Sequence, residues 1–250
     1  MLKDKIILIT GAAGGIGWAT AEYCAQQGAR LALADYDQEA GETAANMLQE
    51  KGYEAIFLHT DVTSAEQVEK MITATVDHYG QLDGAFNNAG IEPPPVHAAD
   101  ILEKDFDRVM NTNLKGVWLC LKYQLKQMVG QEHGAIVNNA SVSGLVGAPR
   151  LAGYAASKHG VIGLTKSAAL EYTRYGIRIN AVCPAVIRTP MVERILTITP
   201  QLGEKLVAGN PSRRLGEPHE VGALVAWLLS SAASFVNGSA IPVDGAYSAQ

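Results

Sequence analysis

Two residue types that can exchange a proton stand four positions apart, at Tyr154 and Lys158. Residues i and i+4 of a helix lie on the same face, so a helix here would place the ammonium group beside the phenol. A nearby positive charge favours the phenolate, and lowering the pKa of a tyrosine from near 10 by about 3 units requires roughly 4 kcal/mol. The spacing predicts an acid/base that acts on a substrate oxygen, although one such pair can arise by chance among nine tyrosines.

A serine hydroxyl is expected close to this pair. Ser141 lies thirteen residues before Tyr154 and closely follows the apolar segment 135–137. The carboxyl ends of parallel strands border the crevice in which ligands bind. Ser141 is therefore a candidate hydrogen-bonding partner of a substrate oxygen, although a serine at a strand end more often only caps a turn.

The sequence is rich in glycine, with 25 glycines in 250 residues. Several of them cluster between an apolar run and a helix-forming run, at Gly11, Gly14, Gly15 and Gly17. A glycine turn that opens a helix presents free backbone N–H groups and the positive end of the helix dipole, which together bind a pyrophosphate. The spacing is Gly-x-x-x-Gly-x-Gly rather than the commoner Gly-x-Gly-x-x-Gly. In this context it predicts a dinucleotide site.

An acidic residue stands where the adenosine ribose of such a dinucleotide would lie. Asp35 ends the second strand-like run, 24 residues after Gly11. A carboxylate there accepts hydrogen bonds from the ribose hydroxyls of NAD. The 2′-phosphate of NADP would bring like charge within about 4 Å, which costs on the order of 4 kcal/mol at an effective dielectric of ~20. No Arg or Lys occurs among residues 12–18 or 34–40, so we predict NAD rather than NADP.

Apolar runs of strand length alternate with segments of helix length along the whole chain. Helix punctuation is clear at Gly28, which follows the segment 19–27, and at 63–66, a capping-box pattern that opens a helix ending near Gly80. Continuous apolar strands separated by helices indicate a parallel sheet buried on both faces, and hence a doubly wound α/β sandwich. The expected strands are 6–9, 31–34, 55–58, 84–86, 135–137, 177–182 and 240–243.

The composition excludes several classes of protein. With 48% hydrophobic and 18% charged residues the sequence is typical of a globular protein. No apolar stretch approaches the roughly 18 to 20 residues of a membrane span, and the start lacks the features of a signal peptide, so we expect a cytoplasmic protein. A net charge of −5 without a basic run disfavours nucleic acid as a partner. The three cysteines are widely spaced and the histidines lack ligand spacing, so we expect free thiols and no metal.

One expected helix is apolar on every side, over Val117–Leu121. Such a helix must be covered all round. The sheet covers one side, and either a partner subunit or a neighbouring helix of the same chain would cover the other.

Five motifs in register make the sequence resemble the short-chain dehydrogenase/reductase family in its compact form. They are Thr10-Gly11-x-x-x-Gly15-x-Gly17, Asn87-Asn88-Ala89-Gly90, Asn113, Ser141 and Tyr154-x-x-x-Lys158. The resemblance continues through Pro184–Thr189 to Val243-Asp244-Gly245, so it covers essentially the whole chain.

The resemblance implies one Rossmann-type domain over residues 1–250, with a seven-stranded parallel sheet of order 3-2-1-4-5-6-7, and a homotetramer. It implies that Tyr154 is the general acid/base, that Lys158 lowers the pKa of Tyr154 and holds the nicotinamide ribose, and that Ser141 hydrogen-bonds the carbonyl or alkoxide. Asn113 would kink its helix and hold a water in a proton relay with Lys158. The implied cofactor-binding residues are Gly11, Gly14, Gly15, Ile16, Gly17, Asp35, Tyr36, Asp61, Val62, Asn88, Ala89, Gly90, Tyr154, Lys158, Pro184, Ile187 and Thr189.

Two positions depart from the family pattern. Ala185 and Ala246 stand where glycines are common, and we expect the first, near the nicotinamide, to matter more. The segment 188–215 occupies the place of the family's substrate lid, and its apolar side chains suggest a hydrophobic pocket. The candidate substrate residues are Ser143, Leu145, Val146, Met191 and Ile195.

The sequence favours an NAD-dependent oxidoreductase that interconverts a secondary alcohol, with cyclic and hydrophobic ones among the candidates, and its ketone by hydride transfer. One alternative is a carrier-protein-linked 3-oxoacyl reductase of the same family, which usually goes with NADP and a basic docking patch. Another is a catalytically silent nucleotide-binding protein of the same fold, for which a broken Tyr-x-x-x-Lys motif or a lost serine would be expected. Both are intact here.

Overall fold

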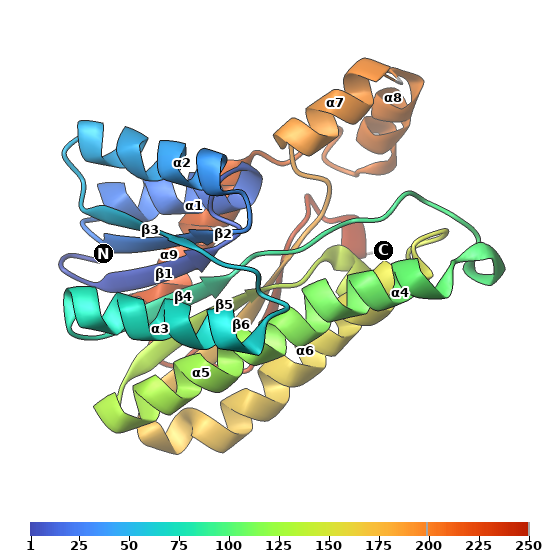
Figure 1. The fold of residues 1–250 in the computed structure, drawn as a ribbon. Coiled ribbons are helices and arrows are strands. Elements are labelled where there is room, and N and C mark those ends of the chain that lie inside the picture. The colour runs from blue at the N-terminus through green and yellow to red at the C-terminus, as the bar shows by residue number, and fades with distance from the viewer. Residues whose placement is uncertain (199, 250) are drawn as a thin grey trace.

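The computed structural model describes residues 1–198 and 200–249. Within the segment 190–209 the side chains of residues 191, 195, 198 and 200–202 are outside this description. The centre of the molecule is a seven-stranded, all-parallel sheet of order β3-β2-β1-β4-β5-β6-β7 (Figure 1). This is the predicted sheet and strand order. Its strands are β1 Ile6–Thr10, β2 Arg30–Asp35, β3 Ala55–His59, β4 Gly84–Asn87, β5 Gly134–Asn139, β6 Ile177–Pro184 and β7 Ala240–Val243.

Helices cover both faces of the sheet. The first face carries α1 Gly15–Gln26, α2 Gln38–Glu50 and α9 Pro218–Leu229. The second carries α3 Ala65–Tyr79, α5 Gly116–Gln131 and α6 Ala152–Tyr172, with α4 Glu103–Met110 running into α5 through a π-helical turn at Asn111–Lys115. The helices α7 Pro190–Ile198 and α8 Pro200–Gly209 stand away from both layers, above the sheet (Figure 1).

The buried strands supply two hydrophobic cores, one on each side of the sheet. Successive side chains of a strand point to opposite faces. Ile7 and Ile9 accordingly pack on the side of α1 and α9, whereas Leu8 packs on the side of α3 and α5. This arrangement leaves the carboxyl ends of the strands as the edge along which polar residues gather.

The ends of α3 test the helix signals in the sequence. Ser64 is the N-cap and accepts from the backbone N–H of Gln67, while Gln67 Oε1 accepts from the N–H of Asp61. The cap therefore lies one residue later than the Thr63–Glu66 pattern predicted, because Gln67 rather than Glu66 reaches back. The predicted end is correct, since Gly80 closes the helix with φ +87°.

The apolar helix at Val117–Leu121 is covered mainly by its own chain. Val117, Leu119 and Cys120 are buried in the core formed with α3, α6 and the strands. Trp118 is the exception at 44% exposed. Of the two covers left open by the sequence, neighbouring helices of the same chain account for most of this surface.

None of the helices that the structure describes is long and apolar enough to cross a membrane. Cys24, Cys120 and Cys183 are all buried free thiols.

Candidate active site

The glycine turn lies between β1 and α1, as the sequence predicted. Gly11 and Gly15 adopt φ of +63° and +55°, a region that favours glycine. A Cβ on Gly17 would collide with the carbonyl oxygen of Gly11, so that position also requires glycine. A Cβ on Gly14, the N-cap of α1, would meet nothing within 4 Å, so the main chain at this helix N-terminus is open to a ligand. An open, glycine-lined N-terminus fits a pyrophosphate.

The segment after β4 is tied to this turn. The Thr10 hydroxyl accepts from the N–H groups of Asn88 and Ala89 at 3.0 and 3.1 Å. The Asn88 amide donates to the carbonyls of Thr10 and Gly11 at 3.1 and 2.9 Å, and the Asn139 amide of β5 donates to Asn88 Oδ1 at 2.8 Å. Side chains from three strand ends therefore fix the wall along which the dinucleotide would lie.

The carboxylate of Asp35 is held in a fixed orientation at the end of β2. Its two oxygens accept from the backbone N–H groups of Ala13 at 2.9 Å and Asp37 at 3.1 Å. A carboxylate has about four acceptor positions, so each oxygen keeps one for a ligand hydroxyl. Tyr36, the next residue, is 72% exposed, and its carbonyl contacts His59 Nε2 at 2.9 Å.

Two of the expected cofactor-binding residues, Asp61 and Val62, follow β3. Asp61 Oδ1 accepts from both the N–H and the hydroxyl of Thr63 at 2.8 Å, which shapes the turn before α3. Val62 is buried and packs against Gly116 at the start of α5. Asp61 and Val62 therefore lie at the carboxyl edge of the sheet together with Asp35.

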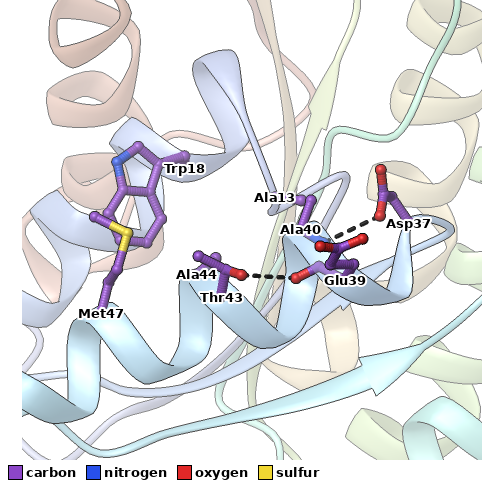
Figure 2. A pocket seen from close by; sticks show the side chains of 8 residues that line it. All are labelled: Ala13, Trp18, Asp37, Glu39, Ala40, Thr43, Ala44 and Met47. Atoms are coloured by element: carbon purple, nitrogen blue, oxygen red, sulfur yellow. Dashed lines mark hydrogen bonds between the residues drawn. The ribbon is translucent and has the colours of Figure 1, made fainter.

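A cavity of about 390 Å³ adjoins Asp35 between α1 and α2. Figure 2 shows that Trp18 and Met47 form one end of it and that Asp37 and Glu39 lie at the other, close to Ala13. Asp37 also caps α2 by accepting from the Ala40 N–H at 3.0 Å. None of the eight residues that line the cavity is basic, so this space beyond Asp35 has no cation to hold a phosphate.

The proton-transfer residues converge at the other end of the crevice. Lys158 is 4% exposed, and its Nζ lies 5.6 Å from the centre of the Tyr154 ring, one turn earlier on α6. This Nζ donates to the carbonyl of Asn139 at 2.7 Å. The Ser141 hydroxyl accepts from the N–H of Ser143 at 3.1 Å and lies close enough to the Tyr154 phenol to lower its pKa. Phenol, ammonium and hydroxyl thus meet in one place, as the sequence predicted.

Asn113 occupies the π-helical turn before α5 and is fully buried. The turn matches the expected interruption of the helix at Asn113. Its amide forms a clamp on Ile91: Oδ1 accepts from the Ile91 N–H and Nδ2 donates to the Ile91 carbonyl, both at 2.8 Å. Nδ2 also lies 3.4 Å from the Ser157 hydroxyl. The Asn113 side chain therefore holds the loop after β4. The relay water that the family resemblance implies would need a hydrogen-bonding group other than this amide.

The local electrostatics differ from the expectation. Burial lowers the pKa of Lys158 to about 8. Burial and the nearby charge of Glu92 raise the pKa of Tyr154 above its usual value, against a smaller lowering by the Ser141 hydroxyl. The chain's own groups therefore raise the pKa of Tyr154, whereas the sequence predicted that Lys158 would lower it, because desolvation of the phenolate is the largest influence on this group.

The loop after β6 approaches the glycine turn. Thr189 packs on Gly15, where an added Cβ would lie 3.2 Å from Thr189 Cγ2. Buried Ile187 pairs with Gly216 in an isolated bridge, and the Arg188 N–H donates to the Gly216 carbonyl at 2.8 Å. Pro184 ends β6 and is buried. The two termini of the 188–215 segment are thereby joined at one point.

Of the two departures from the family pattern, Ala246 is the strained one. It has φ +70°, in the left-handed region, whereas Ala185 is absent from the positive-φ residues that the described chain contains. Of these two residues only Ala246 adopts the conformation that glycine allows more easily, whereas the greater effect of Ala185 near the nicotinamide stays a prediction.

The candidate substrate residues are only partly placed. Ser143, Leu145 and Val146 follow Ser141 in the loop before α6; Leu145 is 37% exposed and Val146 is half-buried. The side chains of Met191 and Ile195 lie outside the described residues.

The sequence did not predict a role for Glu92, whose charge acts on both Tyr154 and Lys158. Its position two residues after the Asn87–Gly90 motif was the available signal.

Comparison with known proteins identifies the family. Residues 11–248 match a family model described as enoyl-(acyl carrier protein) reductase. Levodione reductase of Leifsonia aquatica is 45% identical over 253 residues, which cover 98% of this chain and 95% of that protein. The chain belongs to the short-chain dehydrogenase/reductase family. Other members include 2,5-dichloro-2,5-cyclohexadiene-1,4-diol dehydrogenase of Sphingobium indicum (41% identity; 99% and 98% covered) and cyclohexanol dehydrogenase of an Acinetobacter species (39%; 99% and 96%).

Solved structures of the family share the whole fold. The crystal structure of levodione reductase matches with a TM-score of 0.96 at 44% identity, covering 100% of this chain and 99% of that one. NAD⁺-bound xylitol dehydrogenase matches at 0.93 and 36% identity (98% and 99% covered), and ElxO with NADP at 0.94 and 34% (99% and 100%). Family members of this fold therefore use either nicotinamide cofactor, and the chain is an oxidoreductase of the alcohol/ketone type.

Proposed function

We propose that this protein interconverts a cyclic secondary alcohol and its ketone with NAD as cofactor and Tyr154 as general acid/base. The observation that carries the proposal is the convergence of Tyr154, Lys158 and Ser141 beside the open glycine turn. Relatives named for levodione, a cyclohexadiene-diol and cyclohexanol support a six-membered ring as the substrate.

Each side chain has a role that its contacts permit. In ketone reduction the Tyr154 hydroxyl gives its proton to the substrate oxygen, and the Ser141 hydroxyl donates to the same oxygen. The bond from Ser141 to the Pro184 carbonyl is long, at 3.5 Å, so that proton is easily redirected. The Lys158 ammonium group donates one of its three N–H groups to the Asn139 carbonyl. The other two N–H groups can hydrogen-bond the ribose of the cofactor. Asn113 keeps Gly90 and Ile91 in place beside this cluster.

The same residues hold the proton in the alcohol-oxidising direction, where Tyr154 must act as a base. Burial and Glu92 raise the pKa of Tyr154, which favours the protonated phenol. A bound nicotinamide supplies the hydride acceptor and, when oxidised, a positive charge at this end of the crevice. We expect that charge, with protonated Lys158, to favour the phenolate.

The preference for NAD rests on Asp35. Its carboxylate is fixed by Ala13 and Asp37, and the cavity beyond it is acidic at that end. The cofactor would extend from there past Asp61, Val62 and Asn88–Gly90 to Pro184–Thr189.

We further propose that residues 1–250 form one domain, with 188–215 as the substrate lid hinged at the Ile187–Gly216 bridge. We propose that the side chains of Ser143, Leu145 and Val146 line the substrate pocket, and Met191 and Ile195 remain candidate substrate residues from the sequence.

We also propose a homo-oligomer, a tetramer by family resemblance. An apolar groove of about 500 Å³ lies between α4, α5 and α6, where Trp118 and Leu164 border Gly160 and Gly163. A second copy of the chain would cover the exposed Trp118. Light scattering of the wild type and of Trp118→Glu measures the oligomeric state, and a monomeric wild type would contradict the proposal.

We also propose a cytoplasmic location. The three buried free thiols accord with it, and cell fractionation measures it.

The decisive experiment is an initial-rate screen of cyclohexanol, cyclic diols and acetoacetyl thioester with NAD and NADP. Tyr154→Phe is expected to lower kcat/KM by about 100- to 10,000-fold. Tyr172→Phe, at the other end of the same helix α6, is the matched control and should be neutral. Activity retained in Tyr154→Phe would refute the role of Tyr154, and turnover confined to the thioester with NADP would favour a carrier-linked reductase.

A further inference from the structure

One charged side chain beside the reacting groups has no role in the proposed proton transfer. Glu92 follows the Asn87–Gly90 segment at the carboxyl end of β4 and is exposed to solvent. Among the described residues it has no hydrogen-bonding or ion-pair partner of its own. A carboxylate in this place is free to bind something that enters the crevice.

The main chain before Glu92 is rigidly placed. The buried Asn113 amide clamps both the N–H and the carbonyl of Ile91 at 2.8 Å. Gly90 lies so close to the catalytic cluster that a Cβ on it would be 3.2 Å from Asn113 Oδ1 and 3.7 Å from Lys158 Nζ. Glu92 therefore extends from a backbone that Asn113 anchors and that passes close to the ammonium group of Lys158.

The electrostatics agree with this placement. The charge of Glu92 raises the pKa of both Tyr154 and Lys158, so the carboxylate lies within reach of the two groups. The Lys158 ammonium is already bonded to the Asn139 carbonyl at 2.7 Å. Although part of Glu92 is exposed to solvent, partial desolvation of its carboxylate raises its pKa, and Lys158 opposes this by favouring the ionised form. An ionised carboxylate accepts hydrogen bonds and donates none.

We propose that Glu92 accepts a hydrogen bond from a second hydroxyl group of the substrate, which makes the enzyme selective for cyclic diols and hydroxyketones over simple cyclic alcohols. This inference rests on the proposed alcohol/ketone activity. One oxygen of the substrate would bind Tyr154 and Ser141, and the other would bind Glu92. The same negative charge would repel substrates that carry a carboxylate.

The test compares cyclohexanol with the 1,2-, 1,3- and 1,4-cyclohexanediols in the wild type, Glu92→Gln and Glu92→Leu. The quantity measured is the ratio of kcat/KM for the best diol to kcat/KM for cyclohexanol. A hydrogen bond to a charged group is worth about 10- to 100-fold, so Glu92→Leu should lower the ratio by that factor and Glu92→Gln by less. Glu103→Gln, which removes an exposed carboxylate at the start of α4, is the matched control and should leave the ratio unchanged.

The ratio separates recognition from catalysis. Removing Glu92 also removes a charge that raises the pKa of Tyr154, but this shifts the pH profile equally for every substrate. An unchanged ratio in Glu92→Leu, or a wild type that does not prefer any diol, would overturn the proposal while the alcohol activity stands. A wild type that oxidises none of these alcohols would instead overturn the proposed function, and this inference with it.

Discussion

Replacing Asp35 by serine should remove the preference for NAD. In the wild type both oxygens of Asp35 are fixed by the N–H groups of Ala13 and Asp37, so the carboxylate cannot turn away from an incoming 2′-phosphate. Serine removes the charge and keeps one small acceptor. Asp37 and Glu39 remain at the acidic end of the adjoining cavity, so some repulsion of NADP persists in the variant.

The magnitude follows from two terms. Two unit charges about 4 Å apart interact by about 4 kcal/mol at an effective dielectric of 20, and solvent at this half-exposed strand end reduces that to about 2 kcal/mol. The ribose hydroxyls of NAD lose a charged acceptor, worth about 1.5 kcal/mol. Together these predict that the ratio of kcat/KM with NAD to kcat/KM with NADP falls by roughly 300-fold, at 1.4 kcal/mol per factor of ten.

Initial rates at varied NAD and NADP, with one saturating alcohol, measure the ratio directly. Asp100→Ser, which removes an exposed carboxylate far along the chain, is the control and should leave it unchanged. A wild type that prefers NADP would refute the reasoning from Asp35. So would an Asp35→Ser ratio within threefold of the wild type, because the carboxylate would then not discriminate between the cofactors.

Three further predictions concern stability and are measured by urea or thermal unfolding. Ala246→Gly should stabilise the protein by about 1 kcal/mol, because Ala246 holds φ +70°; a lower melting temperature would contradict this. Thr165→Val should destabilise by about 2 kcal/mol, since the Asn138 amide donates to the Thr165 hydroxyl at 2.9 Å inside the core, whereas Thr165→Ser keeps that bond and should cost less. Burial raises the pKa of Asp83, but hydrogen bonds from the Ile6 N–H, Lys5 and Gln81 hold it below its usual 3.8. Asp83 therefore stabilises the fold fully above pH 3.8 and progressively less as the pH falls through its folded pKa, so Asp83→Asn should cost about 2 kcal/mol at pH 7 and much less near pH 3. A constant difference between the two pH values would show that the charge is not responsible.

The fold was predictable because its signals are local. Apolar strand runs, glycine stops and the rule that parallel strands expose their carboxyl ends together were enough to predict a doubly wound parallel sheet, and the family resemblance supplied its strand order. The same rule predicted that Ser141, after β5, would meet Tyr154 on α6, and the structure places them together. Where the local signal was ambiguous the prediction erred by one residue, since Gln67 rather than Glu66 completes the cap of α3.

By itself, then, the sequence determined the strands of the parallel sheet, the glycine turn and the set of groups that can move a proton, because these depend on residue type and spacing along the chain. Only the tertiary structure decided that the chain's own helices bury most of α5, that Asn113 clamps Ile91, and that the charge of Glu92 acts on Tyr154. It also decided the direction in which the pKa of Tyr154 moves. Burial and charge interactions depend on distances between segments that are remote in sequence, and no spacing rule along the chain contains those distances.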